Sequence, residues 1–476
     1  MKTICMNKYA IFSILLYLFS VIFSALDLNG ICIIVSFFAS IFLVISVRKI
    51  YGNYSNITFL FVVFSIIYGL SGPIAAYFGT GLAEIFGKEY IYLSYFISFS
   101  LSEIGLLIGI SIQKSKIGTD SIEHKKEKCK IKIVENQQFL SITIIITMLI
   151  STLFQLINTF RAGGISAIML GKAYYQAQES ALTLTLPAEI VNLLAFACIS
   201  IYLSLKISNK QKINYLLLFI TAIIFLPYLL IIVFLGQRGK LLHIIITCFI
   251  GIFYFIPFKK IGIKFILLAI IAYLGMGILT ATRSITYLLK ENPDEFWKLA
   301  TDKERYINAL NPGKGEFGCA YGNYNFFMLK NNYEYKLGDS YIKGFLMLVP
   351  AFAYPGVKPT QITYEFRDTY FPSEGNRSAI AGTGFSSILE AFWNFGYIGV
   401  FVIYIIYGLI LAKLDIKVSN NSFISLIMYT YMSSFVLEFH RAAFCDSACS
   451  IIYKFIIMFC LVFIPYSRFK RRKYNV

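Results

Sequence analysis

The chain has 476 residues, of which 58% are hydrophobic and only 14% are charged, and its mean hydropathy is +0.69. Soluble domains carry about 25% charged residues, so this composition excludes a soluble globular protein. The formal net charge of +18 would suit nucleic acid binding. Most of the basic residues, however, fall in short runs between apolar segments, where they are typical of membrane topology signals, and no nucleic acid partner is expected.

Apolar segments of roughly 20 residues, the length that a helix needs to cross a bilayer, recur along the chain. The first follows Lys2 and Lys8 and lacks a convincing cleavage site, so we interpret it as an uncleaved first helix. We expect an all-α polytopic membrane protein with about twelve transmembrane helices, because helices satisfy their own backbone hydrogen bonds in lipid. The expected spans are Tyr9–Ala25, Ile31–Val47, Thr58–Tyr77, Tyr90–Ile112, Phe139–Phe160, Leu184–Leu205, Ile213–Leu235, Leu241–Phe258, Ile263–Thr280, Ser387–Leu411, Phe423–Glu438 and Ser447–Ile464.

Basic residues are concentrated in alternate loops, including Lys114–Lys132, Lys206–Lys212 and the tail Arg468–Lys473. The intervening short loops contain almost no Lys or Arg. The positive-inside rule therefore places both termini in the cytoplasm and the longest loop on the outer side. The predicted organisation is nine helices with short loops in residues 1–280, a large outer loop of short helices in residues 281–386, and three helices with a basic tail in residues 387–476.

Ionisable residues lie near the outer ends of the expected spans and in the long outer segments, and such residues at membrane depth are candidates for function. Glu390 and His440 are candidate bases that would activate a sugar hydroxyl. The planar fork of arginine suits bidentate binding of phosphate. Headgroup contact for an arginine and a structural ion pair for a carboxylate remain alternatives. The candidate pyrophosphate ligands are Arg161, Arg238, Arg283, Arg305, Arg367, Arg377 and Arg441.

Motifs for metal or nucleotide chemistry are missing from the sequence. It has no P-loop, no HExxH and no DxD, and its cysteines form no CxxC pair. The first outer loop, Asp27–Gly30, is too short for the acidic metal site of many sugar transferases that use lipid-phosphate donors. We read the nearest acidic pair, Asp302 and Glu304, as a solvated helix turn. We therefore expect no metal and no cofactor.

Two segments resemble the Wzy polysaccharide polymerases, which join O-antigen or oligosaccharide repeat units in bacterial envelopes. One is Gly384-Phe-Ser-Ser-Ile-Leu-Glu390, which continues through Trp393-Asn-Phe-Gly396, and the other is Gly236-Gln-Arg-Gly-Lys240. The expected topology is similar as well, with both termini inside and one dominant outer loop late in the chain. Arg161…Gly171 and Arg305…Gly315 approximate an arginine–glycine pattern of some members, with a spacing that is one residue shorter.

The resemblance implies transfer of a growing glycan from undecaprenyl pyrophosphate to the terminal hydroxyl of a second lipid-linked repeat unit, outside the bacterial cytoplasmic membrane. The arginines would stabilise the leaving pyrophosphate, and Glu390 or His440 would act as base. Expected partners are undecaprenyl-pyrophosphate-linked oligosaccharides and membrane lipids. A chain-length regulator protein is a further candidate partner. Two alternatives stay open. One is an O-antigen ligase, and the other is a lipid-linked oligosaccharide flippase or transporter, which the large outer loop disfavours.

Overall fold

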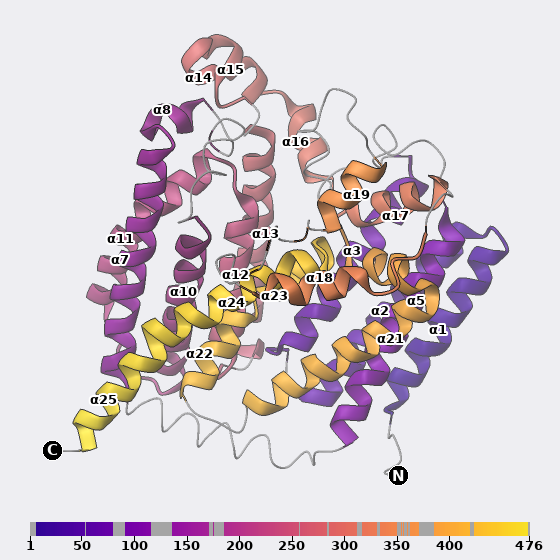
Figure 1. Ribbon diagram of the computed structural model, residues 1–476, viewed down its shortest axis with the longest axis horizontal. Coiled ribbons are helices and arrows are strands. Elements are labelled where there is room, and N and C mark those ends of the chain that lie inside the picture. The colour runs from indigo at the N-terminus through magenta and orange to yellow at the C-terminus, as the bar shows by residue number, and fades with distance from the viewer. Residues whose placement is uncertain are drawn as a thin grey trace. The chain divides into compact units, whose positions relative to one another are not determined.

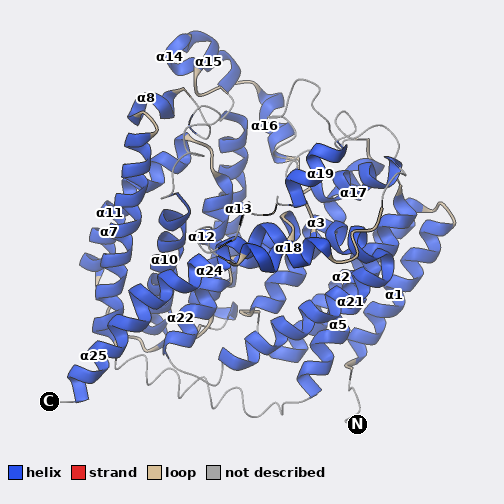
Figure 2. Cartoon of the chain, viewed as in Figure 1, coloured by secondary structure: helices blue, strands red, loops and turns tan. Residues whose placement is uncertain are grey.

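The computed structural model consists of helices joined by loops, and no strand occurs within the residues that it describes (Figure 2). The expected all-α polytopic class is thereby confirmed. The described residues are 6–52, 54–79, 91–115, 136–170, 175, 185–256, 258–282, 285–311, 317–330, 334–349, 354, 356, 359, 362–370, 385–418 and 423–474.

Within this part of the chain, eight helices are long and apolar enough to cross a membrane. Each corresponds to one of the expected spans, although the ends are shifted. They are α1 (Lys8–Ala25), α2 (Asn29–Tyr51), α3 (Ile57–Tyr77), α5 (Tyr92–Ser115), α7 (Gln137–Arg161), α10 (Thr185–Ser208), α11 (Tyr215–Phe234) and α21 (Ser387–Val418).

The other four expected spans correspond to helices that are not among these eight. Two of them are α12 (Arg238–Phe253) and α13 (Phe258–Thr282). The span expected at residues 423–438 is divided into α22 (Phe423–Met432) and α23 (Phe435–Arg441). The last consists of α24 (Phe444–Met458) and the π-helix η2 (Phe459–Phe463), which continues into α25 (Ile464–Tyr474).

Two serines lie at the break between α22 and α23. The hydroxyl of Ser433 donates to the carbonyl of Thr430 at 2.6 Å, and that of Ser434 donates to the carbonyl of Tyr431 at 3.2 Å. Such side chains compete with the helical backbone for hydrogen bonds and often bend or end a helix. Hydropathy does not register this effect, which is why a continuous span was expected here.

The chain forms two compact units, each assembled from separate stretches of sequence. Unit 1 comprises Met1–Glu123, Asn311–Ser419 and Phe435–Ile452, and unit 2 comprises His124–Leu310, Asn420–Ser434 and Tyr453–Val476. These units group residues by contact, whereas the boundaries expected at residues 280 and 386 divide the chain by order. That division stays a prediction.

In unit 1, α5 and α21 pack closely side by side (Figure 1). Glycines permit this approach: an added Cβ at Gly105 would lie 2.5 Å from the carbonyl oxygen of Phe401, and Gly109 and Gly408 face backbone in the same way. Small residues four positions apart commonly allow two membrane helices to pack closely.

Near its other end, α21 caps α3, because the carboxylate of Asp415 accepts hydrogen bonds from the backbone N–H groups of Ile57 and Thr58.

Three short helices from the long segment of residues 281–386 also belong to unit 1. They are α17 (Cys319–Lys330), α18 (Asp339–Met347) and α19 (Ile362–Tyr370). The hydroxyl of Tyr324 anchors α17 to Ser94 and Ser98 of α5, at 3.0 and 2.7 Å. The ring of Phe366 joins α19 to Trp393 of α21, with centroids 5.8 Å apart. These contacts hold the short helices against the long ones.

In unit 2, α10 packs against both α7 and α12. Ser151 of α7 donates to the carbonyl of Ala188 at 3.1 Å, and Ser204 of α10 donates to the carbonyl of Ile252 at 2.7 Å. The remaining short helices of the unit are α8 (Gly164–Met169), α14 (Leu288–Glu291), α15 (Pro293–Ala300) and α16 (Lys303–Leu310). With α17 to α19 of unit 1, α14 to α16 supply the short helices that the sequence predicted for residues 281–386.

Candidate functional site

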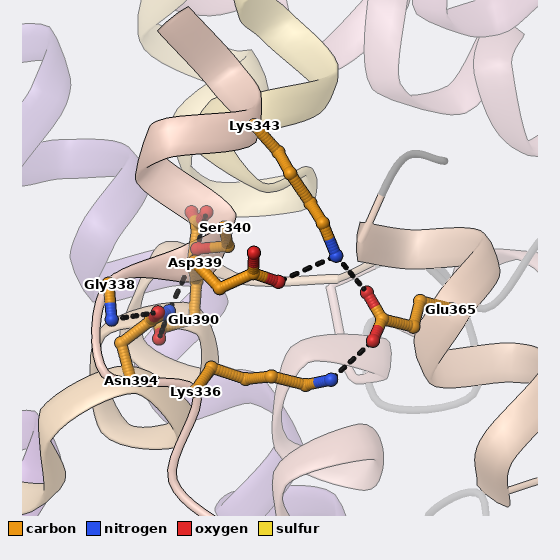
Figure 3. Close-up of polar contacts among 8 residues, drawn as sticks. All are labelled: Lys336, Gly338, Asp339, Ser340, Lys343, Glu365, Glu390 and Asn394. Atoms are coloured by element: carbon orange, nitrogen blue, oxygen red, sulfur yellow. Dashed lines mark hydrogen bonds and ion pairs between the residues drawn. The ribbon is translucent and has the colours of Figure 1, made fainter. Parts of the chain in front are cut away.

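Glu390 stands in the first turn of α21, within the segment that the sequence analysis singled out. Its side chain has no solvent-exposed surface. Oε1 accepts a hydrogen bond from the hydroxyl of Ser340 at 2.7 Å, and Oε2 accepts one from the backbone N–H of Phe444 at 2.6 Å. The carboxylate therefore connects α21 to the first turn of α18 (Figure 3) and, through Phe444, to the start of α24.

Asn394 extends this contact one turn further along α21. Its Oδ1 accepts from the backbone N–H of Gly338 at 2.9 Å, while its Nδ2 donates at 2.8 Å to the hydroxyl of Ser340 and to the carbonyl of Glu390. The backbone of Lys336 also donates to the carbonyl of Trp393. Neither Asn394 nor Ser340 was a predicted site residue, although Asn394 lies inside the Trp393–Gly396 segment that resembles the polymerases.

An ion-pair network lies beside these residues and joins α18 to α19 (Figure 3). Glu365 forms ion pairs with Lys336 and, at 3.0 Å, with Lys343, which also pairs with Asp339 at 2.6 Å. Burial by itself raises the pKa of Glu365, but the hydrogen bonds from the two lysines outweigh it and lower that pKa. Burial lowers the pKa of Lys343, whereas its hydrogen bonds to Asp339 and Glu365 raise it overall. The sequence analysis did not predict this network, because Glu365 lies 29 and 22 residues away from Lys336 and Lys343 in the chain.

His440 occupies α23 and is 4% exposed. Its imidazole forms a hydrogen bond with the backbone of Phe61, whose ring centroid lies 4.4 Å away, and it stacks on Tyr68 at 6.1 Å. Within the described residues, Nε2 has no hydrogen-bond partner. A neutral imidazole that donates through Nδ1 keeps an acceptor lone pair on Nε2, which is the form that a general base requires.

Arg441 follows directly and ends α23 with an exposed side chain. Its carbonyl oxygen accepts a hydrogen bond from the backbone N–H of Phe385 at 2.7 Å. Together with the bond between Phe444 and Glu390, this contact ties the turn between α23 and α24 to the start of α21. The structure thus brings Glu390 close to the turn that follows His440 and Arg441.

Unit 2 brings two of the predicted arginines to the end of α13. Arg238 begins α12 after Gly236, which has a φ of +58°. Its Nη1 donates to the hydroxyl of Thr280 at 2.7 Å, and Nη2 of Arg305, on α16, donates to the carbonyl of Ala281 at 3.0 Å. Cations are favourable at a helix C-terminus, so these contacts also stabilise the last turn of α13.

A second polar group of unit 2 centres on Glu189 of α10. Its carboxylate lies 3.4 Å from Nδ1 of His243 and 3.9 Å from Nζ of Lys240, both on α12. The ammonium of Lys240 is buried and forms no hydrogen bond with the described residues. These three residues were not among the predicted ligands, although Lys240 closes the Gly236–Lys240 segment that carried the resemblance.

The described structure does not bring Arg161, Arg283, Arg367 and Arg377 together at a common site. Arg161 ends α7 with an exposed side chain and makes no hydrogen bond or ion pair with the described residues. The backbone of Arg367 belongs to α19, but its side chain lies outside the described structure, as do the whole of Arg283 and of Arg377. No group of three His, Cys, Asp or Glu residues suited to a metal ion occurs in the described ranges.

Comparison with known proteins identifies the family. A family model described as O-antigen polysaccharide polymerase Wzy matches residues 6–473, which is nearly the whole chain. No curated protein and no solved structure shows a significant match. The resemblance noted at Glu390 and at Arg238 therefore extends over both units.

Proposed function

Because the chain belongs to the O-antigen polysaccharide polymerase Wzy family, we propose that it extends surface glycans at the outer face of the bacterial cytoplasmic membrane. The family assignment establishes a multi-pass membrane protein that polymerises lipid-linked oligosaccharide repeat units. The outward placement of residues 281–386 and the cytoplasmic placement of both termini are our proposal, supported by the basic residues of alternate loops.

The proposed donor is a glycan on undecaprenyl pyrophosphate, which arginines would bind through its pyrophosphate group. The observation that carries this proposal is that Arg238 and Arg305 both donate hydrogen bonds to the end of α13, at Thr280 and Ala281. Two guanidinium groups provide fixed donors for the charge that develops on pyrophosphate as it leaves. Arg283 follows the end of α13 in the sequence and is proposed to join them. Arg161, Arg367, Arg377 and Arg441 stay candidate ligands on the sequence alone.

The proposed reaction is a single substitution at the anomeric carbon of the donor glycan. The hydroxyl oxygen of the acceptor repeat unit forms a bond to that carbon, the bond to the pyrophosphate oxygen breaks, and the lipid pyrophosphate leaves with the bonding electrons. The hydroxyl proton passes to a base on the protein. Cationic stabilisation of the leaving group makes a metal ion unnecessary in this scheme.

His440 is the proposed base. Among the described residues, its Nε2 has no hydrogen-bond partner, whereas both carboxylate oxygens of Glu390 accept hydrogen bonds from the protein. A base must lie within hydrogen-bond reach of the proton that it removes. The ring contacts with Phe61 and Tyr68 fix the imidazole in one orientation.

The polymerase activity is tested by the surface glycan of a strain from which the gene is deleted. A polymerase defect leaves a single repeat unit on each lipid core, and the wild-type gene restores the ladder of longer chains. A core that carries no repeat unit would indicate a ligase or a flippase and would contradict the proposal. Polymerisation of purified lipid-linked units in excess EDTA tests metal independence separately, since a loss of activity that magnesium or manganese restores would contradict it.

A further inference from the structure

Glu390, Asn394 and Ser340 are three buried residues that we call the α21 clasp. Glu390 and Ser340 have no exposed surface, and neither does Asn394. Four hydrogen bonds of 2.6 to 2.9 Å that involve their side chains join α21 to the start of α18 and to α24, and a fifth, from Asn394 to the carbonyl of Glu390, lies within α21. Buried polar groups with complete hydrogen bonding fix one arrangement of the elements that they connect.

The carboxylate of Glu390 is engaged on both sides by donors of the protein. Ser340 donates to Oε1 and the backbone N–H of Phe444 donates to Oε2. A substrate hydroxyl would have to displace one of these donors and leave it buried without a partner, which is costly. This geometry suits a residue that organises its surroundings better than one that accepts a proton from substrate.

The clasp controls two segments that carry charged or catalytic groups. Through Ser340 and Gly338 it fixes the start of α18, the helix that presents Lys343 to Glu365. Through Phe444 it fixes the turn that follows His440 and Arg441, which the hydrogen bond from Phe385 to Arg441 also holds. Small displacements of groups that bind or activate a substrate reduce turnover strongly.

We propose that Glu390 is a positioning residue of the polymerase, which holds α18 and the turn after His440 in register through the α21 clasp. The inference rests on the proposed function, because it assigns to His440 the removal of the proton. If Glu390 is a positioning residue, activity requires a side chain at position 390 that is long enough to form hydrogen bonds on both sides. Its negative charge is then of secondary importance.

Two substitutions at one position separate positioning from proton transfer. Glu390→Gln keeps the length, accepts from the N–H of Phe444 and donates to the hydroxyl of Ser340. Glu390→Asp keeps the charge but is one methylene shorter and does not span both partners. Positioning predicts that the glutamine variant loses about tenfold or less in kcat and that the aspartate variant loses more. A general base predicts the reverse order, with a loss of roughly a hundredfold or more for glutamine.

The measurement is polymerisation of lipid-linked repeat units by the purified full-length protein in lipid nanodiscs, across a range of pH. The pH profile of the glutamine variant should keep the shape of the wild-type profile, since the titrating base is still present. Glu334→Gln is the matched control, because Glu334 is exposed in the segment that leads to α18 and its substitution should leave activity unchanged. A glutamine variant that is less active than the aspartate variant, or that lacks one limb of the profile, would overturn the inference.

Hydrogen–deuterium exchange gives a readout that does not depend on activity. The amides of Gly338 and Phe444 donate to the clasp, so they should exchange faster in Asn394→Ala and Glu390→Asp respectively, and both should stay protected in Glu334→Gln. Unchanged exchange in the first two variants would overturn the clasp. If the wild-type protein forms no polymer, the proposed function fails, while the exchange result still decides whether the clasp exists.

Discussion

The Nη1 atom of Arg238 lies 2.7 Å from the hydroxyl oxygen of Thr280, so the first side chain of α12 reaches the last turn of α13. The guanidinium has further donors beyond this one, since arginine carries five N–H groups in a fixed fork. The contact therefore holds α12 to α13, and the fork of the same side chain is the group that we propose to bind pyrophosphate.

For Arg238→Lys we expect a loss of polymerase activity of about tenfold or more at normal abundance, because lysine keeps the charge but loses the fork that binds phosphate bidentately. The assay is chain length and rate with purified lipid-linked units. Thr280→Ala is the control, since it removes the helix contact without changing the cation. Equal losses of activity in the two variants would mean that Arg238 acts through α13 alone.

His440→Ala should lower kcat by at least about a hundredfold while the protein accumulates normally in the membrane, because a base contributes that much to proton transfer. The single-turnover rate with a preformed donor complex is the quantity to measure. Tyr68→Phe keeps the ring that stacks on His440 and should retain most of the activity. Near-normal turnover by His440→Ala would exclude this histidine as the base.

The ion pairs of Glu365 predict a pH dependence of stability. Its pKa is lowered in the folded protein, so its contribution is complete above the ordinary carboxylate pKa and disappears as the pH falls through the lowered value. The pKa of Lys343 is raised, so its contribution is complete below the ordinary lysine pKa and disappears as the pH rises through the raised value. Between these limits the pairs should contribute about 0.2 to 1 kcal/mol each.

The corresponding measurement compares the Tm of the wild-type protein with that of Glu365→Gln in detergent at several pH values. The difference should be largest near neutral pH and should shrink in acid. Glu334→Gln serves again as control, because Glu334 forms no ion pair with the described residues. A difference that stays constant into strong acid would show that Glu365 stabilises α19 by some means other than its charge.

Gly109→Ala should destabilise unit 1 by about 1 to 3 kcal/mol, the usual cost of overpacking an interface. An added Cβ would meet the carbonyl oxygen of Ile405 and would lie 3.1 Å from the Cα of Gly408. Gly275→Ala is the matched control, since that helical glycine has open space around its Cβ position and alanine there should be neutral or stabilising. The comparison uses Tm in detergent, and equal values for both variants would rule out close packing at Gly109.

Cysteine labelling tests the proposed orientation. In intact spheroplasts, an impermeant maleimide should label Tyr335→Cys, which is exposed in the long segment, and should label Lys210→Cys, between α10 and α11, only after lysis. The unsubstituted chain measures the background from its 9 native cysteines. Labelling of Lys210→Cys from outside would reverse the topology.

The sequence predicted the long helices well because hydropathy depends on local composition. The span expected at Phe139–Phe160, for example, is α7 at Gln137–Arg161. It did not predict the break at Ser433 and Ser434 or the kink at Gly396, where φ is +64°, because both depend on backbone conformation and hydrogen bonding.

The candidate site was predicted less completely than the fold. Composition and the resemblance singled out Glu390, His440 and the arginines, but their partners lie far away in sequence. Ser340, for example, is 50 residues from Glu390. Helical periodicity relates residues three or four positions apart and carries no information about such pairs. Only the folded chain shows that both carboxylate oxygens of Glu390 accept hydrogen bonds and that Nε2 of His440 has no partner in the part of the chain that the structure describes.

The packing of α5 against α21 affects when unit 1 can finish folding during synthesis. The helices α1, α2, α3 and α5 are synthesised early. Helix α21, which packs against the glycines of α5 and caps α3 through Asp415, follows much later, since Asp415 is more than 350 residues after Ile57. The early helices of unit 1 must therefore stay in the bilayer with an incomplete interface while α7 to α13 are inserted and pack among themselves. Nascent chains that stop before α21 should accordingly be substrates for membrane proteases and chaperones, whereas chains that include it should become resistant.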